Sequence, residues 1–142
     1  MKPLAKALDD ALDKATGAGA VQAEADGCTV DVDVVDVDRL GVRCSRLRVH
    51  RAGPLDVLDV AADLPDRVRA LGDALVPVEV DPGLGGAILR TVPEDNEFYE
   101  LGAHASGDLE LKRWKGGPGL DREPTDFTLT RKQLGRLVDE LG

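Results

Sequence analysis

Residues 29–38, with the sequence TVDVDVVDVD, constrain the fold of this chain more than any other segment. Valine and aspartate alternate along most of the run, and a period of two is typical of a β-strand that buries one face. The segment that follows is basic and carries Arg43, Arg46, Arg48 and Arg51. A turn at Asp38-Arg39 predicts an antiparallel hairpin in which the acidic strand lies against the basic one, with Asp31 opposite Arg46.

The apolar positions of this hairpin change face halfway along each strand. In the acidic strand Val30, Val32 and Val34 give way to Val35 and Val37, and the basic strand changes at the corresponding point. Two explanations stay open. Either the hairpin buries a different side at each end, or each strand contains a bulge near Val34 and Ser45.

The aspartates of the run also suggest a metal site, which their spacing does not support. A calcium loop needs a third oxygen ligand where Val35 stands and a glycine where Asp36 stands. Residues 31–35, DVDVV, resemble the nucleophile motif DxDx(T/V) of haloacid-dehalogenase-like phosphatases. That chemistry needs a strand end near Mg²⁺, whereas here the strand continues. We therefore expect a structural role for these aspartates and no metal or cofactor.

The remaining sequence of the first half predicts two helices and two further strands. Leu4, Leu8 and Leu12 form the apolar stripe of a helix that begins near Pro3. Residues 21–25 alternate and lead into Asp26-Gly27, a strong two-residue hairpin signal. Residues 55–61 predict a fourth strand. A helix would follow from Asp63 or Leu64, with Pro65 in its first turn, and its buried face would comprise Val68, Leu71, Ala74 and Leu75.

The second half is again rich in predicted strands, at residues 76–80, 87–92, 97–103 and 108–115. The last two form a hairpin across the loop 105–107, in which Leu101 opposes Leu111 and Phe98 opposes Trp114. Residues 116–125 indicate a loop. Thr130 and Gln133 form a capping-box pattern that opens a final helix.

These elements predict an α+β fold of antiparallel β-meanders, with an N-terminal, a middle and a C-terminal helix packed on the sheet, in the order α-ββββ-α-ββββ-α. The chain of 142 residues fits a single domain, 1–142. The two later helices have similar patterns, which suggests a weak duplication of residues 21–75 and 76–141. The order of elements is similar to that of type III secretion chaperones and their relatives, with extra strands and no shared motif.

Charge and cysteine content limit the partners that we expect. The net charge of −9 argues against binding to nucleic acid or to an anionic membrane. The N-terminal segment carries acidic residues where a signal peptide needs an apolar stretch, and no run is long enough to span a membrane. Cys28 and Cys44 are expected to be free thiols in a reducing compartment, which indicates a cytoplasmic protein.

Catalytic patterns are missing from the sequence, so we expect no catalytic residue. Ser45 and Ser106 are the only serines, and neither lies in a nucleophile elbow. His104 beside Asp108 is interpreted as a surface pair across a hairpin, and His50 has no partner pattern.

One cluster stands out as a candidate interaction surface, or alternatively as a small core. It comprises Phe98, Tyr99, Arg113, Trp114 and Lys115. The leading hypothesis is a non-enzymatic interaction module of the chaperone or adaptor type, with an unidentified protein partner and a homodimer as one arrangement. The alternative is a small-molecule-binding domain or an unrecognised enzyme with a pocket near Tyr99, Arg113 and Trp114.

Overall fold

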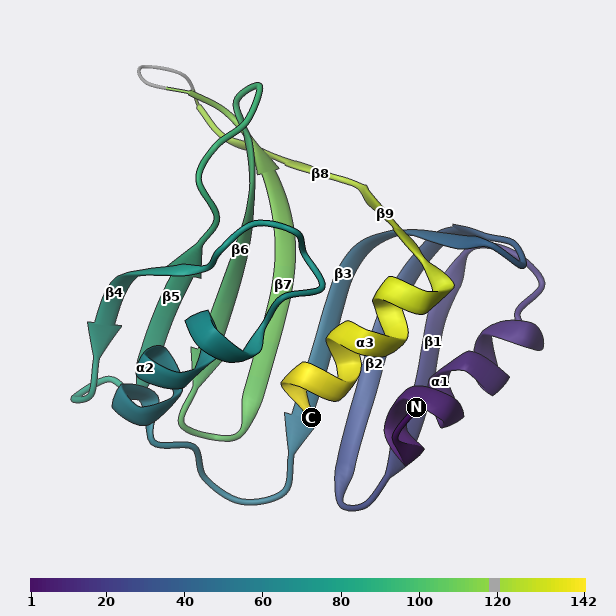
Figure 1. The fold of residues 1–142 in the computed structure, drawn as a ribbon, viewed down its shortest axis with the longest axis horizontal. Helices are drawn as coiled ribbons and strands as arrows, with labels where there is room; N and C mark the ends of the chain where they lie inside the picture. The colour runs from purple at the N-terminus through teal and green to yellow at the C-terminus, as the bar shows by residue number, and fades with distance from the viewer. Residues whose placement is uncertain (118–120) are drawn as a thin grey trace.

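The computed structural model describes residues 1–117 and 121–142, which form three helices and nine strands (Figure 1). The helices are α1 (Pro3–Asp13), α2 (Val57–Arg67) and α3 (Arg131–Leu141). The first strands are β1 (Gly19–Ala25), β2 (Cys28–Val37) and β3 (Gly41–Arg51). The later strands are β4 (Val76–Asp81), β5 (Gly86–Arg90), β6 (Glu97–His104), β7 (Asp108–Lys115), β8 (Glu123–Thr125) and β9 (Phe127–Thr130).

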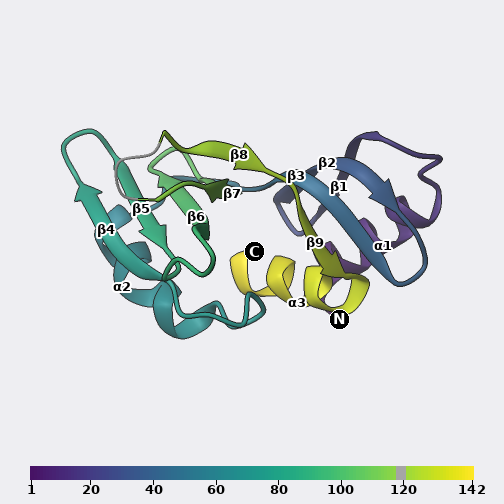
Figure 2. The same cartoon turned by 90° about the horizontal axis from the view of Figure 1, so that it is seen from above.

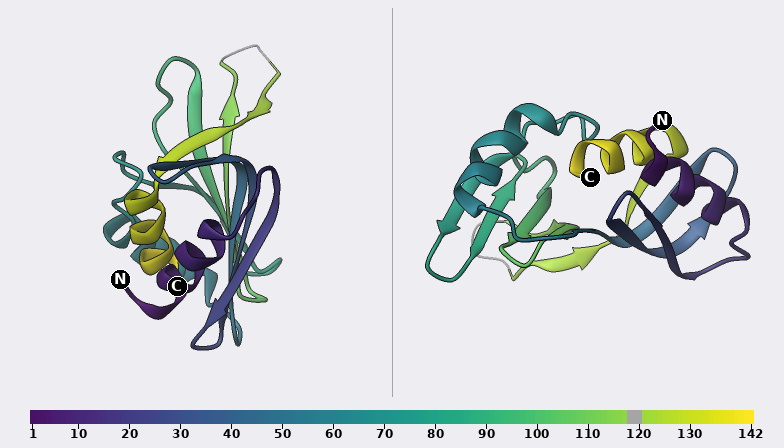
Figure 3. Two further views of the ribbon diagram at one scale, coloured as in Figure 1. Left: turned by 90° about the vertical axis from the view of Figure 1, so that its right-hand side faces the viewer. Right: turned by 90° about the horizontal axis from the view of Figure 1, so that it is seen from below.

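The strands form one antiparallel sheet in the order β1-β2-β3-β7-β6-β5-β4, with β8 paired to β7 and β9 paired to β3. The two halves of the chain meet where β3 pairs with β7, and there Leu47 opposes Leu111 and Val49 opposes Leu109. All three helices lie on one face of this sheet (Figures 2 and 3). The predicted α+β fold of antiparallel strands with helices packed on the sheet is confirmed. The duplication of residues 21–75 and 76–141 stays a prediction.

The hairpin of β1 and β2 has the register that its turn predicts. Asp26 and Gly27 have positive φ angles of 53° and 77°, the backbone conformation that a tight two-residue hairpin turn requires. Ala25 opposes Cys28, and Val21 opposes Val32. Because the turn fixes the register, Val21, Ala23 and Ala25 of β1 share a face with Val30 and Val32 of β2.

The register predicted for the hairpin of β2 and β3 is wrong by two residues. The turn spans residues 38–41 instead of two residues, because the carboxylate of Asp38 accepts hydrogen bonds from the amides of Leu40 (2.7 Å) and Gly41 (2.8 Å). The two hydrogen bonds, with that from the Gly41 amide having the larger effect, hold the pKa of Asp38 below its ordinary value. The wider turn shifts the pairing, so Asp31 opposes Arg48 and not Arg46, which opposes Asp33.

Bulges explain the change of face in this hairpin, as the second of the two explanations predicts. The register slips on both sides of Val34, which leaves Val35 and Ser45 without a pairing partner. After the slip Val34 lies opposite Cys44, and both side chains are buried. The bulges thus keep the core side of the hairpin continuous while the alternation of the sequence is interrupted.

The strand predicted at residues 55–61 is wrong, because this segment begins helix α2. Asp56 caps the helix by accepting hydrogen bonds from the amides of Leu58 (3.0 Å) and Asp59 (3.3 Å). The buried residues Val57, Ala61 and Leu64 follow a helical spacing. The helix ends at Arg67, so residues 68–75 are not the predicted middle helix, and the first run contains three strands rather than four.

The predictions for the second half of the chain fare better. In the hairpin of β6 and β7, Leu101 opposes Leu111 and Phe98 opposes Trp114, as expected. The capping box at the start of α3 is present, with the hydroxyl of Thr130 accepting from the amide of Gln133 at 3.0 Å. Strands β8 and β9 occupy parts of residues 116–130 for which no strand is predicted; of the predicted loop 116–125, residues 118–120 lie outside the described residues.

Iodoacetamide is expected to modify Cys28 and to leave Cys44 unmodified in the folded protein at pH 8. Cys44 is fully buried, and burial, with the charges of Asp126 and Asp33, raises the pKa of its thiol from 9.0 to about 12. Only the thiolate reacts, so the folded state protects this residue. Mass spectrometry of the labelled peptides, with a sample unfolded in urea as control, measures the difference.

The same buried thiol gives stability a pH dependence of known sign. A group whose pKa is raised by folding contributes stability that is complete below its unfolded pKa and is lost at higher pH. The stability that burial of Cys44 contributes is therefore lost as the pH rises from about 9.0 to about 12.

In the labelling experiment, equal modification of Cys28 and Cys44 in the native state would show that Cys44 is not held in a closed core.

Candidate functional site

The helix-free face of the sheet is the surface on which the chain gathers its polar side chains. Along β2 the buried Val30 and Val32 alternate with Asp31 and Asp33, which point to this face. The central strands β3, β7 and β6 alternate in the same way, since one face of each is buried under the helices. This face, called the open face below, is therefore where a partner or ligand has access to the sheet.

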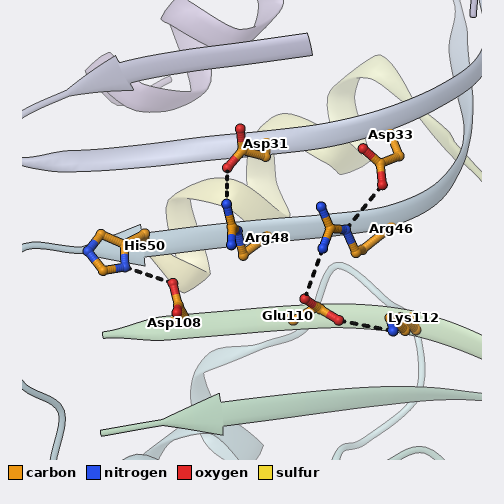
Figure 4. Close-up of polar contacts among 8 residues, drawn as sticks. All are labelled: Asp31, Asp33, Arg46, Arg48, His50, Asp108, Glu110 and Lys112. Atoms are coloured by element: carbon orange, nitrogen blue, oxygen red, sulfur yellow. Dashed lines mark hydrogen bonds and ion pairs between the residues drawn. The ribbon is translucent and has the colours of Figure 1, made fainter. Parts of the chain in front are cut away.

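A ladder of ion pairs crosses the open face from β2 to β7 (Figure 4). Arg48 donates to Asp31 at 2.9 Å, and Arg46 donates to Asp33 at 3.1 Å. Arg46 also reaches Glu110 at 3.4 Å. The predicted pairing of an acidic strand with a basic one is thus confirmed, although the individual partners differ. Such partly exposed cross-strand pairs contribute only about 0.2–1 kcal/mol each.

A second set of hydrogen bonds, next to this ladder (Figure 4), connects β3 to the turn between β6 and β7. His50 Nδ1 lies 2.7 Å from Asp108 Oδ1, and the hydroxyl of Ser106 donates to Asp108 Oδ2 at 3.3 Å. The predicted pair of His104 with Asp108 is wrong, because His104 Nδ1 contacts Ser106 instead, at 2.8 Å. The hydrogen bond from His50 is the first of the contacts that hold the pKa of Asp108 below its ordinary value.

The order of the hydrogen-bonded groups His50, Asp108 and Ser106 differs from that of a nucleophilic triad. A triad needs a histidine between the serine and the acid, so that the acid orients the base. Here Asp108 lies between Ser106 and His50. These three groups therefore link the β6–β7 turn to β3 and do not form a nucleophilic triad.

Next to the hydrogen bonds of His50, Asp108 and Ser106, the open face has a hollow at Gly102. An added Cβ at Gly102 would meet nothing within 4 Å, so the missing side chain leaves a depression of about 430 Å³ between the neighbouring strands. Gly86 and Ile88 of β5 continue its floor. Carboxylates stand on both sides of this first hollow: Glu79 and Asp81 from β4, and Asp108 and Glu110 from β7.

A second hollow of about 340 Å³ lies on the same face near the start of β4. Its lining is mainly apolar and consists of Val76, Val78, Arg90, Thr91, Val92, Pro93 and Phe98. Val76, Val78 and Val92 are 48%, 51% and 71% exposed. Large apolar side chains at this exposure are a recognised feature of binding surfaces when they form a group.

The structure separates the five residues predicted as an interaction surface. Phe98 and Trp114 oppose each other on the open face, where Arg122 lies over the Trp114 ring at 4.2 Å. Tyr99 is buried on the helix side, in edge-to-face contact with Phe127 at 5.5 Å. Burial raises the pKa of Tyr99, and Arg113 lies over its ring at 4.6 Å.

The sheet thus brings Tyr99 and Arg113 together on one side and Phe98 and Trp114 on the other. Lys115 is exposed at the end of β7. Phe98 is the member of this set that lines the second hollow. A small-molecule pocket shared by Tyr99, Arg113 and Trp114 stays a prediction, and the sheet that separates Trp114 from the other two gives it no support.

Sequence reasoning missed both hollows, because each combines residues from several strands. The residues 76–80 alternate imperfectly, with Val76, Val78 and Val80 all apolar beside Pro77 and Glu79. That pattern predicts a strand but does not say which valines stay exposed. The exposed fraction depends on β4 lying at the edge of the sheet, which is a property of the tertiary structure.

Three further observations complete the description of the site. In the part of the chain that the structure describes, no group of three or more histidine, cysteine, aspartate or glutamate side chains is arranged to hold a metal ion. Within the same residues, every helix is too short or too polar to cross a membrane. No family model, curated protein or solved structure matches this chain.

Proposed function

We propose that this chain is a non-enzymatic interaction module of the chaperone or adaptor type, which binds a partner protein through the β4–β6 part of the open face. The observation that carries the proposal is the concentration of exposed apolar side chains there. Eight large hydrophobic side chains are exposed in residues 1–117 and 121–142, and four of them belong to residues 76–92. These four are Val76, Val78, Leu84 and Val92.

The two hollows give this apolar surface a shape that a partner can fill. Leu84 lines the first hollow, and the three valines line the second. Protein interfaces combine a desolvated apolar centre with a polar rim, and the carboxylates of β4 and β7 supply such a rim. Fully burying an exposed valine or leucine side chain is favourable by about 1.5–3 kcal/mol, so completing the burial of these partly exposed side chains favours a complex.

Direct pairing of a partner strand with the edge of β4 is less favourable than packing on its face. Pro77 has no amide hydrogen to donate, and the register of β4 slips between Pro77 and Glu79. Proline and bulges are the features by which edge strands avoid pairing. We therefore place the interface on side chains and not on the backbone of β4.

Replacing Val78 with aspartate is expected to abolish capture of the partner from an extract of the native cell. A carboxylate in the centre of an apolar interface would be desolvated without a counter-ion, which costs several kcal/mol. Leu58→Asp is the matched control, because Leu58 is 55% exposed on α2, away from both hollows. The proteins retained by the immobilised chain are compared by mass spectrometry.

Two results would count against the proposal. One is that Val78→Asp retains the same proteins as the unmodified chain, which would place the interface elsewhere. The other is that the unmodified chain retains nothing and light scattering finds a strict monomer. A dimer in light scattering that Val78→Asp converts to a monomer would identify the partner as a second copy of the chain.

A further inference from the structure

We infer that the first hollow receives a lysine or arginine side chain of the partner, with its alkyl stem over Gly102 and Ile88 and its cationic group between the carboxylates of β4 and β7. This inference rests on the proposed function and adds the chemistry of the partner to it. Three properties of the hollow support it: its shape, the charges of its rim, and the apolar hollow beside it.

The shape suits a long side chain with an apolar stem. Gly102 leaves open space at the centre of the hollow, and the backbone of Gly86 and the side chain of Ile88 extend its floor. Lysine and arginine lay their methylene groups along apolar surface while the charged end stays near water or a counter-ion. The floor of this hollow offers the first environment, and its rim offers the second.

Of the four carboxylates on the rim, the two on β7 have counter-ions within the described residues and the two on β4 do not. Asp108 is paired with His50, and Glu110 is paired with Arg46 and Lys112. Glu79 and Asp81, on the opposite side, take part in none of the ion pairs formed within the described residues. One oxygen of Asp81 accepts from the amide of Leu84 at 3.1 Å. A cation entering the hollow would therefore meet two carboxylates that have no counter-ion.

These charges select among the occupants of the face. A second copy of the chain would bring the same carboxylates and a net charge of −9, so a face-to-face dimer here would be repulsive. Nucleic acid is repelled for the same reason. A protein segment with a basic side chain is attracted, and the acidic rim would also speed its association.

The second hollow adds a requirement for an apolar side chain in the same segment. Both hollows are lined in part by β4, the apolar one by Val78 and the acidic one by Asp81. Three residues of an extended strand span about 10 Å. In an extended partner segment, side chains two residues apart share one face and lie about 7 Å apart, and the length of a lysine or arginine side chain covers the remaining distance. The partner segment should therefore present an apolar and a basic side chain two residues apart.

The test is a nuclear magnetic resonance titration of the full chain with synthetic peptides. The first peptide repeats the unit Gly-Val-Ser-Arg; one control replaces arginine with glutamate, and another replaces valine with serine. Spermine serves as a free cation without apolar side chains. We expect the first peptide to shift the amide signals of Gly86, Ile88 and Gly102, and we expect its affinity to fall as salt is added.

Two variants locate the effect. Glu79→Gln removes one unpaired carboxylate and should weaken the first peptide roughly twofold to fivefold, the range of one partly exposed charge pair. Gly102→Val fills the hollow and should weaken binding of the first peptide more than about tenfold. Valine fits a strand, and the site has room for it, so circular dichroism should show an intact fold. Glu24→Gln, which removes a carboxylate from the open face at β1, should leave the affinity unchanged.

Each other outcome overturns the inference in an identifiable way. Equal binding of the arginine and glutamate peptides would disprove the cationic preference. If spermine binds more tightly than the first peptide, the ligand of the hollow is a free polyamine and not a side chain of a protein partner. A third outcome is that no peptide shifts the amide signal of Gly102 while Val78→Asp still abolishes capture of the cellular partner. That outcome would overturn the inference and leave the proposed function standing. If Val78→Asp retains the partner, the proposed function itself fails.

Discussion

Replacing Leu111 with alanine is expected to lower the free energy of unfolding by about 2–5 kcal/mol. Leu111 is fully buried on β7, with Leu47 of β3 opposite on one side and Leu101 of β6 opposite on the other. It therefore lies where the two halves of the sheet join. Truncation removes apolar contacts and leaves a cavity, because two paired strands hold the surrounding backbone in place. Equilibrium unfolding in urea measures the loss.

The matched control for this variant is Leu84→Ala. Leu84 is the same residue type but is 81% exposed, so its truncation should change the free energy of unfolding by less than about 0.5 kcal/mol. The slope of the unfolding transition should stay unchanged in both variants, since neither alters the surface exposed on unfolding by much. A Leu111→Ala variant as stable as Leu84→Ala would mean that β3 and β7 do not form the core seam described above.

Replacing Arg131 with alanine is expected to destabilise the fold by about 1–3 kcal/mol. The guanidinium group is mostly buried at the start of α3 and joins three elements. It donates to the carboxylates of Asp9 and Asp13 in α1, and to the carbonyl oxygen of Asp38 in the β2–β3 turn. Loss of the cation leaves two carboxylates facing each other without their shared partner.

Arg131→Lys and Arg136→Ala separate the causes of this loss. Lysine keeps the charge but cannot reproduce the forked set of donors, so Arg131→Lys should lose an intermediate amount. Arg136 is 61% exposed and lies 3.9 Å from Glu140, so Arg136→Ala should be nearly neutral. If Arg131→Ala were as mild as Arg136→Ala in urea unfolding, Arg131 would be a surface residue and not a link between α1 and α3.

The features that the sequence predicted correctly are those set by nearby residues. Asp26-Gly27 specifies the register of β1 and β2 because only a few backbone conformations close a two-residue turn. Thr130 and Gln133 satisfy each other's backbone amides within one helical turn. In both cases the interacting groups lie within a few residues, so the pattern contains the whole interaction.

The errors arose where a polar side chain competed for the backbone. Asp38 captures two amides and widens its turn, which moved the partner of Asp31 from Arg46 to Arg48. Asp56 caps a helix at a place where the apolar residues after it also suit a strand. Both aspartates have the local hydrogen-bonding ability that makes this residue frequent in turns and caps. In each case the surrounding apolar pattern was ambiguous, and a single cap decided the outcome.

The candidate site was less accessible to sequence reasoning than the fold. Phe98, Tyr99 and Trp114 are close in the hairpin of β6 and β7, but adjacent residues of a strand point to opposite faces, so the sheet divides them. The hollow at Gly102 depends on β4 and β7, which flank β5 and β6 on either side. No spacing in the chain indicates that Glu79 and Asp108 lie on opposite sides of one depression.

The run TVDVDVVDVD and the arginines that follow it determined that the chain contains a charged antiparallel hairpin, but they left open whether its two ends bury the same face. Only the tertiary structure decided which arginine meets which aspartate, and that β3 joins β7 so that Glu110 extends the ladder of charges. The physical reason is that alternation has a period of two, so a shift of two residues preserves every buried position. The choice between such registers falls to a turn, a bulge and the neighbouring strand.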